Sequence, residues 1–194
     1  MAFSVDDDEF QVDEATLTGI LPDPYWCDTY NKGNGKAMFW YLTIKAKEQL
    51  IDGDLESPML LHQNVPLVHQ NWRSVGNDTF TWNASDDVDA HLYTFESDVV
   101  AVGELRFGKR EGLNVPIRWQ GETETFCSTF SVETQVIFTG IKVRGSERDT
   151  DGTTRARLAS CFDISNLVQN DLRVEDFAYE SGVRVAMSLF VPRP

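Results

Sequence analysis

The sequence predicts an all-β protein: an antiparallel β-sandwich of jelly-roll type, with a partly open β-barrel as the alternative architecture. About ten short runs of β-like residues are separated by turn residues roughly every eight to twelve positions, a spacing typical of sandwiches and barrels. Helical periodicity is weak, so at most one or two short helices are expected, at 45–51 and 164–169.

The length and composition fit one domain. The chain has 194 residues, of which 41% are hydrophobic and 25% are charged, and single β-sandwiches and barrels commonly reach about 200–250 residues. Residues 1–14 carry six acidic side chains and are expected to form a solvated N-terminal arm. Residues 15–194 are therefore predicted to form a single sandwich domain.

In chain order, the first clear strand is 36–47, which follows an Asn-Gly pair. Residues 52–78 have weak periodicity and scattered Pro, Gly and Asn, so long loops are expected there. Residues 99–107 and 113–119 then alternate apolar and polar side chains on either side of a short polar loop. This arrangement predicts a hairpin.

Two further hairpins are expected in the C-terminal half. Residues 135–144 place Ile137 and Ile141 on one face, and the chain returns through 155–163 after a polar segment that ends in Asp-Gly, a strong hairpin signal. Residues 183–191 alternate strictly. One face of this strand is predicted to carry Val183, Val185, Met187, Leu189 and Val191, and the other Arg184, Ala186, Ser188 and Phe190.

The charge of the chain narrows the classes of partner. The formal net charge is −14, which repels polyanions and argues against nucleic acid or an anionic membrane as the main partner. A basic partner or cations are favoured instead. The chain has no signal-peptide pattern and no apolar run of the roughly 20 residues that span a bilayer. Its three cysteines form no Cys-x-x-Cys pair, so a cytoplasmic protein with reduced thiols is expected.

The histidines supply a candidate metal site. Asp87, Asp89 and His91 alternate in sequence, so an extended backbone would place their side chains on one face. Carboxylate and imidazole groups arranged in this way could bind a divalent cation. His62 or His69 would complete the ligand set from a neighbouring loop. The competing interpretation is a polar turn that leads into a strand and needs no metal.

The aromatic residues supply a candidate binding surface. Trp26 and Trp72 lie among Pro, Asp, Asn and Arg residues and are expected to be exposed, together with Tyr25 and Arg73. Exposed rings beside polar side chains could stack against a sugar or form the centre of a protein interface. The alternative is that the large rings fill the core.

No catalytic motif is present: the sequence contains neither Gly-x-Ser-x-Gly nor His-Glu-x-x-His. The prediction is a non-catalytic binding or structural protein, without a cofactor, that presents loops and an acidic surface to a macromolecular partner. That partner would be a basic protein, as for a neutralising immunity-type protein, or further copies of the chain in an assembly. Two alternatives stay open: a metal-dependent enzyme with a His/Asp site, and a carbohydrate-binding β-sandwich.

Overall fold

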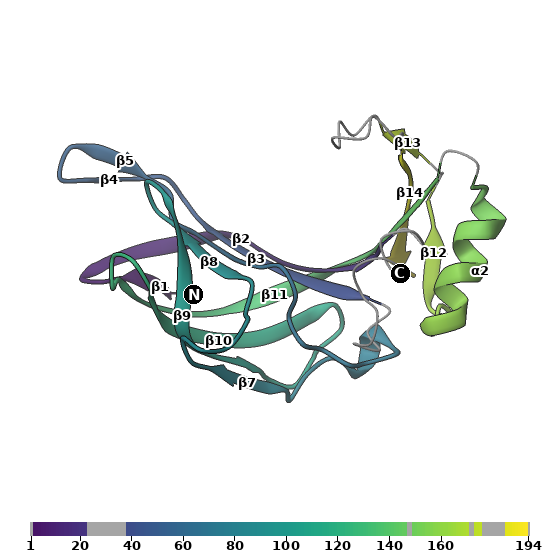
Figure 1. The fold of residues 1–194 in the computed structure, drawn as a ribbon, viewed down its shortest axis with the longest axis horizontal. Helices are drawn as coiled ribbons and strands as arrows, with labels where there is room; N and C mark the ends of the chain where they lie inside the picture. Colours follow the sequence, from purple (N-terminus) through teal and green to yellow (C-terminus); the bar gives the residue numbers. More distant parts are fainter. Residues whose placement is uncertain (1, 23–37, 147–148, 171–172, 176–184, 194) are drawn as a thin grey trace. The chain divides into compact units, whose positions relative to one another are not determined.

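The computed structural model describes residues 2–22, 38–146, 149–170, 173–175 and 185–193 (Figure 1). The chain divides into two compact units. The first, the barrel unit, comprises Met1–Leu17, Trp40–Leu67 and Val75–Phe138. The second, the helix unit, comprises Thr18–Phe39, Val68–Ser74 and Thr139–Pro194.

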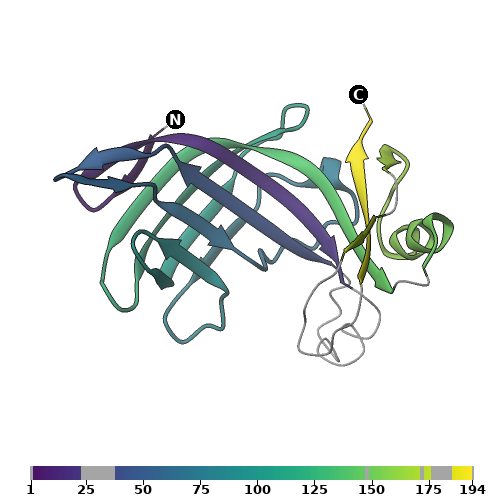
Figure 2. The ribbon, with the colours of Figure 1, turned by 90° about the horizontal axis from the view of Figure 1, so that it is seen from above.

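The core of the barrel unit is a closed ring of eight antiparallel strands (Figure 1, Figure 2). In ring order they are β1 (Ala2–Val5), β2 (Asp8–Leu21), β3 (Phe39–Ala46), β6 (Met59–His62), β8 (Ala90–Tyr93), β9 (Ser97–Phe107), β10 (Asn114–Thr123) and β11 (Thr129–Ser146). The ring closes because β11 pairs with β1, from Ala2 opposite Glu133 to Val5 opposite Phe130.

The all-β, antiparallel prediction is thus confirmed. The jelly-roll sandwich is not confirmed, and the barrel that was its alternative describes the sheet better. The predicted hairpin of 99–107 with 113–119 is present as β9 and β10, and the predicted strand 36–47 is present as β3 from Phe39 onward. Residues 52–78 contain the short strands β5 (Asp54–Glu56) and β6 in addition to loops.

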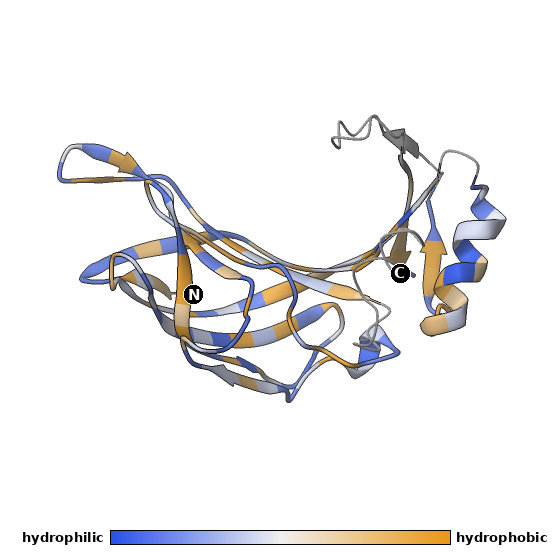
Figure 3. Ribbon diagram, in the orientation of Figure 1, coloured by the Kyte–Doolittle hydropathy of each residue, from blue (hydrophilic) through white to orange (hydrophobic). Residues whose placement is uncertain are grey.

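Apolar and polar residues alternate along the barrel strands (Figure 3), and the apolar set fills the interior. One interior row of cross-strand neighbours consists of Trp82, Gly103, Gly121, Phe130 and Val5. Trp82 ends β7 (Thr79–Trp82), which pairs with the second half of β9. Its indole and the Phe130 ring occupy the space that the two glycines leave open: a Cβ on Gly121 would lie 2.9 Å from Phe130 Cζ.

The expected acidic arm over residues 1–14 does not form. Residues 2–5 are β1 and residues 8–14 are the first half of β2. Phe3 and Phe10 are buried in the barrel, and their rings pack 6.4 Å apart. The acidic residues between them give the segment its polar character in sequence. Alternate apolar side chains nevertheless hold it in the sheet, which explains why composition alone misled the prediction.

The buried face of β11 changes at Gly140. Phe130, Val132 and Phe138 face the interior of the barrel unit, whereas Ile141 is buried in the helix unit. Gly140 has φ +129, a conformation that L side chains rarely adopt, and it moves the buried set from even to odd positions. Ile137, predicted to lie on the same face as Ile141, is therefore exposed while Ile141 is buried.

The helix unit contains α2 (Asp151–Cys161) where a strand was predicted at 155–163. Thr150 is the N-cap, and its side chain accepts the Thr153 backbone N–H. Thr154, Leu158 and Phe162 are buried at a spacing of four, which suits one face of a helix and also alternate positions of a strand. This shared spacing is the reason for the wrong prediction.

The sheet of the helix unit is built on β14 (Val185–Pro192), which pairs with the end of β11, with β12 (Leu167–Gln169) and with β13 (Arg173–Glu175). The strand prediction at 183–191 is confirmed from Val185, and the described part of the strand has one fully buried face. This face consists of Ala186, Ser188 and Phe190. Small side chains suit this face because Ser188 Oγ lies 3.3 Å from Thr154 Oγ1 of α2.

Neither of the two short helices predicted from the sequence forms. Residues 45–51 hold the end of β3 and β4 (Gln49–Ile51), and 164–169 hold a turn and β12. Besides α2, the described residues form one short 3-10 turn, η1 (Trp72–Ser74). No helix in this part of the chain is long and apolar enough to cross a membrane. Cys127 and Cys161 are free thiols, and Cys27 lies outside the described residues.

Candidate functional site: the loop end of the barrel

The predicted metal ligands do not come together as one set. His62 points into the barrel, is 1% exposed and packs between Trp82 and Trp119, with ring centroids 5.6 and 5.9 Å away. His91 lies on the neighbouring strand β8, where Leu61 and not His62 is its cross-strand partner. Since cross-strand partners share a face and adjacent residues alternate, His62 and His91 point to opposite faces of the sheet.

His91 does contact part of the predicted set. Its Nε2 lies 3.1 Å from Oδ1 of Asp89, and its Nδ1 lies 3.2 Å from Oγ of Ser97. Asp87 is exposed in the loop between β7 and β8, and His69 belongs to the helix unit. Within the described ranges, no three or more His, Cys, Asp or Glu side chains are grouped so that they could hold a metal ion.

The predicted aromatic surface also differs. Trp72 is 5% exposed in η1, with the Arg73 guanidinium 5.6 Å from its ring centroid, so the expectation that it is exposed was wrong. Tyr25 and Trp26 lie outside the described residues. The four described tryptophans are all buried, as the core-filling alternative predicted. Polar neighbours in sequence say little about burial in a turn, because successive side chains there point in different directions.

A different site emerges at one end of the barrel. The strand registers bring four connections to this end: the β1–β2 turn, the hairpin of β4 with β5, the β8–β9 turn and the β10–β11 loop (Figure 1). We define the loop end as residues 6–9, 47–57, 94–98 and 122–128. All of these residues belong to the barrel unit.

The loop end exposes large apolar side chains. Leu50 and Leu55 are 66% and 69% exposed, and Phe95 and Phe126 are 73% and 57% exposed. Among the described residues no other phenylalanine is exposed, and Leu113 is the only other exposed leucine. Single exposed apolar residues are ordinary, but several at one end of a domain are typical of an interaction surface.

The loop end is also strongly acidic. It holds twelve of the 31 acidic residues of the chain and one of the 17 basic residues, Lys47. The acidic residues are Asp6, Asp7, Asp8, Glu9, Glu48, Asp52, Asp54, Glu56, Glu96, Asp98, Glu122 and Glu124. Asp98 is buried, and the others form an acidic rim that makes this end far more negative than the chain average.

The β4–β5 hairpin presents its leucines on one face. Asp52 and Gly53, with φ of 49 and 103, form the turn, and Leu50 is the cross-strand partner of Leu55. Two positive φ values suit the type I′ hairpin turn for which Asp-Gly is favoured. The side-chain amide of Gln49 ties the hairpin to the barrel by donating to the carbonyl of Glu9 at 3.1 Å.

Carboxylates crowd the other face of this hairpin. Partial burial of its own carboxyl, followed by the charges of Asp8, Asp54 and Asp52, raises the pKa of Glu56 above its ordinary value. Like charges held together in this way repel one another, and a cationic group placed among them would relieve the repulsion. The electrostatics of the hairpin therefore favour a positively charged partner.

Asp98 fixes the backbone of the β10–β11 loop through hydrogen bonds. This carboxylate accepts the backbone N–H of Phe126 at 2.9 Å and that of Thr125 at 3.1 Å. Burial would raise the pKa of Asp98, but hydrogen bonds from Phe126, Thr123 and Thr125 outweigh it and hold this pKa below its ordinary value. The ionised carboxylate is thus the form that the loop requires.

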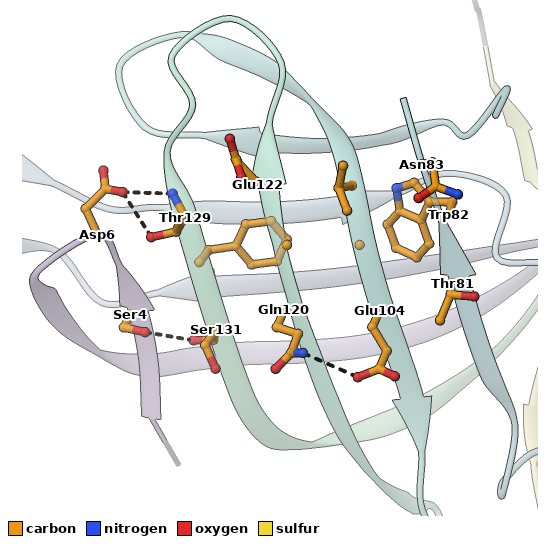
Figure 4. A pocket seen from close by; sticks show the side chains of 14 residues that line it. Ser4, Asp6, Thr81, Trp82, Asn83, Glu104, Gln120, Glu122, Thr129 and Ser131 are labelled. Carbon is orange, nitrogen blue, oxygen red and sulfur yellow. Dashed lines mark hydrogen bonds between the residues drawn. The ribbon is translucent and has the colours of Figure 1, made fainter. Parts of the chain in front are cut away.

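A shallow depression continues from the loop end along the outer wall of the barrel (Figure 4). Polar side chains from adjacent strands line it: Gln120 Nε2 donates to Glu104 Oε2 at 3.4 Å, and Ser4 Oγ donates to the Ser131 carbonyl at 3.3 Å. At its loop-end border, Asp6 accepts hydrogen bonds from Thr129. This wall offers polar side chains beside the acidic rim.

Part of this site was visible in the sequence. Residues 49–56 contain an Asp-Gly pair between apolar residues, which is a hairpin signal. The convergence of four separate segments was not visible, because it depends on strand order. Comparison with known proteins returned no match: no family model, no curated protein and no solved structure matches the chain.

Proposed function

We propose that the chain is a non-catalytic binding protein that docks a basic protein through the loop end of its barrel. One observation carries the proposal: four exposed large apolar side chains lie within segments that hold twelve acidic residues and one lysine. Apolar contacts supply binding energy, and the acidic rim selects a positively charged surface.

Magnitudes show why both features are needed. Burying a Leu or Phe side chain fully contributes about 1.5–3 kcal/mol, so four of them contribute on the order of 6–12 kcal/mol. Association costs an estimated 4–15 kcal/mol in lost freedom of motion. Apolar burial alone therefore leaves little surplus. Charge complementarity raises the association rate and disfavours acidic or neutral partners, because like charges at an interface are costly.

The other two functions have less support. A zinc or similar enzyme site needs about three protein ligands, and the structure brings together only His91 and Asp89 of the predicted set. A sugar-stacking surface of the predicted kind needs exposed tryptophan rings, and the described tryptophans are buried. The loop end is also where protein interfaces are usually found, on connections held by a rigid scaffold.

Site-specific photo-crosslinking in cells of the natural source tests this proposal. Leu55 and Phe126 would each be replaced by the photo-crosslinking amino acid benzoylphenylalanine. Matched controls would carry the same replacement at Ile137 and Val68, which are exposed but lie outside the loop end. We expect both loop-end positions to crosslink to the same protein, with a net positive charge, and the controls to give no such product.

The crosslinked protein would then be purified and its binding to the wild-type chain measured by calorimetry. Replacing both hairpin leucines, Leu50→Ser with Leu55→Ser, is expected to weaken binding by at least tenfold. Equal crosslinking at the control positions, an acidic partner, or products containing nucleic acid or lipid would each contradict the proposal.

A further inference from the structure

We propose that Phe126 is the anchor of this interface, entering an apolar pocket on the basic partner, and that Asp98 is the positioning residue that holds Phe126 in its binding position beforehand. This inference rests on the docking function proposed above. Of the four exposed apolar side chains, Phe126 is thus expected to contribute most to the binding affinity.

The β10–β11 loop is ordered by hydrogen bonds on both sides of Phe126. On one side, the backbone N–H of Thr123 donates to the Ser128 carbonyl at 3.0 Å, and that of Glu124 donates to the Val99 carbonyl at 2.8 Å. On the other, the backbone N–H of Ser128 donates to Thr123 Oγ1 at 3.1 Å.

Two acidic side chains complete this framework. Asp98 accepts the backbone N–H groups of Thr125 and Phe126. Asp6 of the β1–β2 turn accepts the backbone N–H of Thr129 at 2.8 Å, and the Asp6 N–H donates back to the Thr129 carbonyl at 2.8 Å. From 123 to 129, each residue except Cys127 thus donates its backbone N–H to an identified acceptor.

This framework orders the backbone while leaving the apolar ring in solvent. Asp98 is 5% exposed, whereas Phe126 is 57% exposed, and Cys127 takes φ +54, which turns the chain back sharply after the ring. Fixing a flexible residue costs about 1–2 kcal/mol in backbone entropy. A loop that is already ordered avoids this cost on binding, so its exposed ring contributes more to affinity than an equally exposed ring on a flexible segment.

The surroundings of Phe126 indicate the chemistry of the complementary pocket. Glu122 lies at the end of β10, Glu124 lies in the β10–β11 loop, and Glu96 lies in the β8–β9 turn of the same end. A pocket that takes a ring from among these carboxylates is best bordered by Lys or Arg. An Arg side chain can also stack on the ring face while it pairs with a carboxylate. We therefore assign the partner an apolar pocket with a basic margin.

Phe95 provides a matched comparison. It has the same side chain and is slightly more exposed, but it lies in the β8–β9 turn, outside the framework around Asp98. With the purified partner and the full chain, we expect Phe126→Ala to weaken binding by at least thirtyfold and Phe95→Ala by less than threefold. Equal losses for the two variants would overturn the assignment of Phe126 as the anchor.

The positioning role of Asp98 needs a readout beyond affinity. Asp98→Asn keeps the shape but removes the charge, and we expect it to weaken binding five- to tenfold and to speed amide exchange at Thr125 and Phe126. In a Phe126→Ala background the same change is expected to cost less than twofold, because there is no ring left to position. If Asp98→Asn fails to fold, Thr123→Val takes its place in both measurements. This substitution removes the side-chain oxygen that accepts the Ser128 backbone N–H in the same loop.

The outcomes separate this inference from the function on which it rests. If the hairpin leucine variants abolish binding while Phe126→Ala and Asp98→Asn leave it unchanged, the inference is wrong and the docking function stands. If no loop-end variant changes binding, both are wrong. If Asp98→Asn costs as much without Phe126 as with it, Asp98 acts through general stability and its positioning role is overturned.

Discussion

At the scale of single residues, the barrel interior depends on glycines that make room for rings. Gly103 and Gly121 are cross-strand partners, and the rings of Trp82 and Phe130 lie over them. The Trp82 indole is fixed in place because its Nε1 donates to the Val100 carbonyl at 3.0 Å. This arrangement lets large aromatic residues fill a narrow barrel without strain.

Adding a methyl group at either glycine is therefore expected to destabilise the protein. A Cβ on Gly121 would lie 2.5 Å from the Val102 carbonyl oxygen, and one on Gly103 would overlap the indole of Trp82. Overpacking of this kind costs about 1–3 kcal/mol, so Gly103→Ala and Gly121→Ala should each lower the free energy of unfolding in urea by that amount. Gly152→Ala, at the start of α2, where a Cβ would meet only Thr150 Oγ1 at an ordinary 3.8 Å, is the control and should stabilise by up to about 1 kcal/mol.

The contribution of Asp98 to the stability of the fold depends on pH. Because its pKa is lowered in the folded state, its contribution to stability is complete above the ordinary Asp pKa of about 3.9 and is lost as the pH falls through the lower, folded value. Hydrogen bonds to a charged group are each worth about 1.5–3 kcal/mol. We expect Asp98→Asn to lower the melting temperature at pH 5–7, and we expect its difference from the wild type to shrink progressively as the pH falls below about 4. A difference that persists unchanged at pH 2.5 would contradict this role.

Residue-level predictions from the sequence succeeded where alternation decides burial and failed elsewhere. The alternation of β9 and β10 predicted their hairpin correctly. Trp72 was misplaced because η1 has no period of two, and His62 was misplaced because its face depends on the position of β6 in the barrel. Local sequence cannot decide whether a histidine points inward when the neighbouring strands come from distant segments.

At the scale of elements, α2 shows how a cap decides between two structures with the same apolar spacing. Thr150 is extended, with φ −107 and ψ 167, and its side chain accepts the Thr153 N–H at 3.3 Å. Thr150→Ala removes this cap and should cost about 1 kcal/mol, which corresponds to roughly 2–4 °C in melting temperature for a chain of this size.

Two further substitutions make this measurement specific to the cap. Thr150→Ser keeps a side-chain oxygen at the same place and is expected to restore most of the stability. Ser160→Ala, at an exposed position near the other end of α2, should change the unfolding free energy by less than about 0.5 kcal/mol. A Thr150→Ala variant as stable as the wild type would show that the cap does not stabilise α2.

The element scale also explains which face of β14 is buried. The larger side chains Met187, Leu189 and Val191 are half-buried, and the smaller Ala186 and Ser188 are buried against neighbouring elements. Because the helix was predicted as a strand, the need for small residues opposite Thr154 could not be anticipated.

At the scale of the whole molecule, charge separates the loop end from the rest of the chain. The net charge of −14 was known from composition, but the concentration of twelve acidic residues at one end of the barrel follows only from its topology. The predicted acidic arm of residues 1–14 contributes to this surface as part of the β1–β2 hairpin. A basic partner is an expectation from the net charge alone, and the loop end is the surface that we propose would meet it.

Association with the basic partner should depend on salt. The screening length falls from about 10 Å at 0.1 M salt to about 3 Å at 1 M, and steering by a charged rim acts mainly on the association rate. We expect the association rate, measured by stopped flow, to fall at least tenfold from 0.05 to 0.5 M salt. A variant with Asp52→Asn, Asp54→Asn and Glu56→Gln should show a smaller dependence. Equal salt dependence in the two proteins would contradict a steering role for the hairpin.

Hydrogen exchange of the complex, isolated from the natural source and compared with the free chain, tests the central claim most directly. If the loop end is the docking surface, backbone amides in residues 47–57, 94–98 and 122–128 should exchange more slowly in the complex, while α2 should exchange as in the free chain. Protection confined to α2 and β12, with the loop end unchanged, would contradict the account.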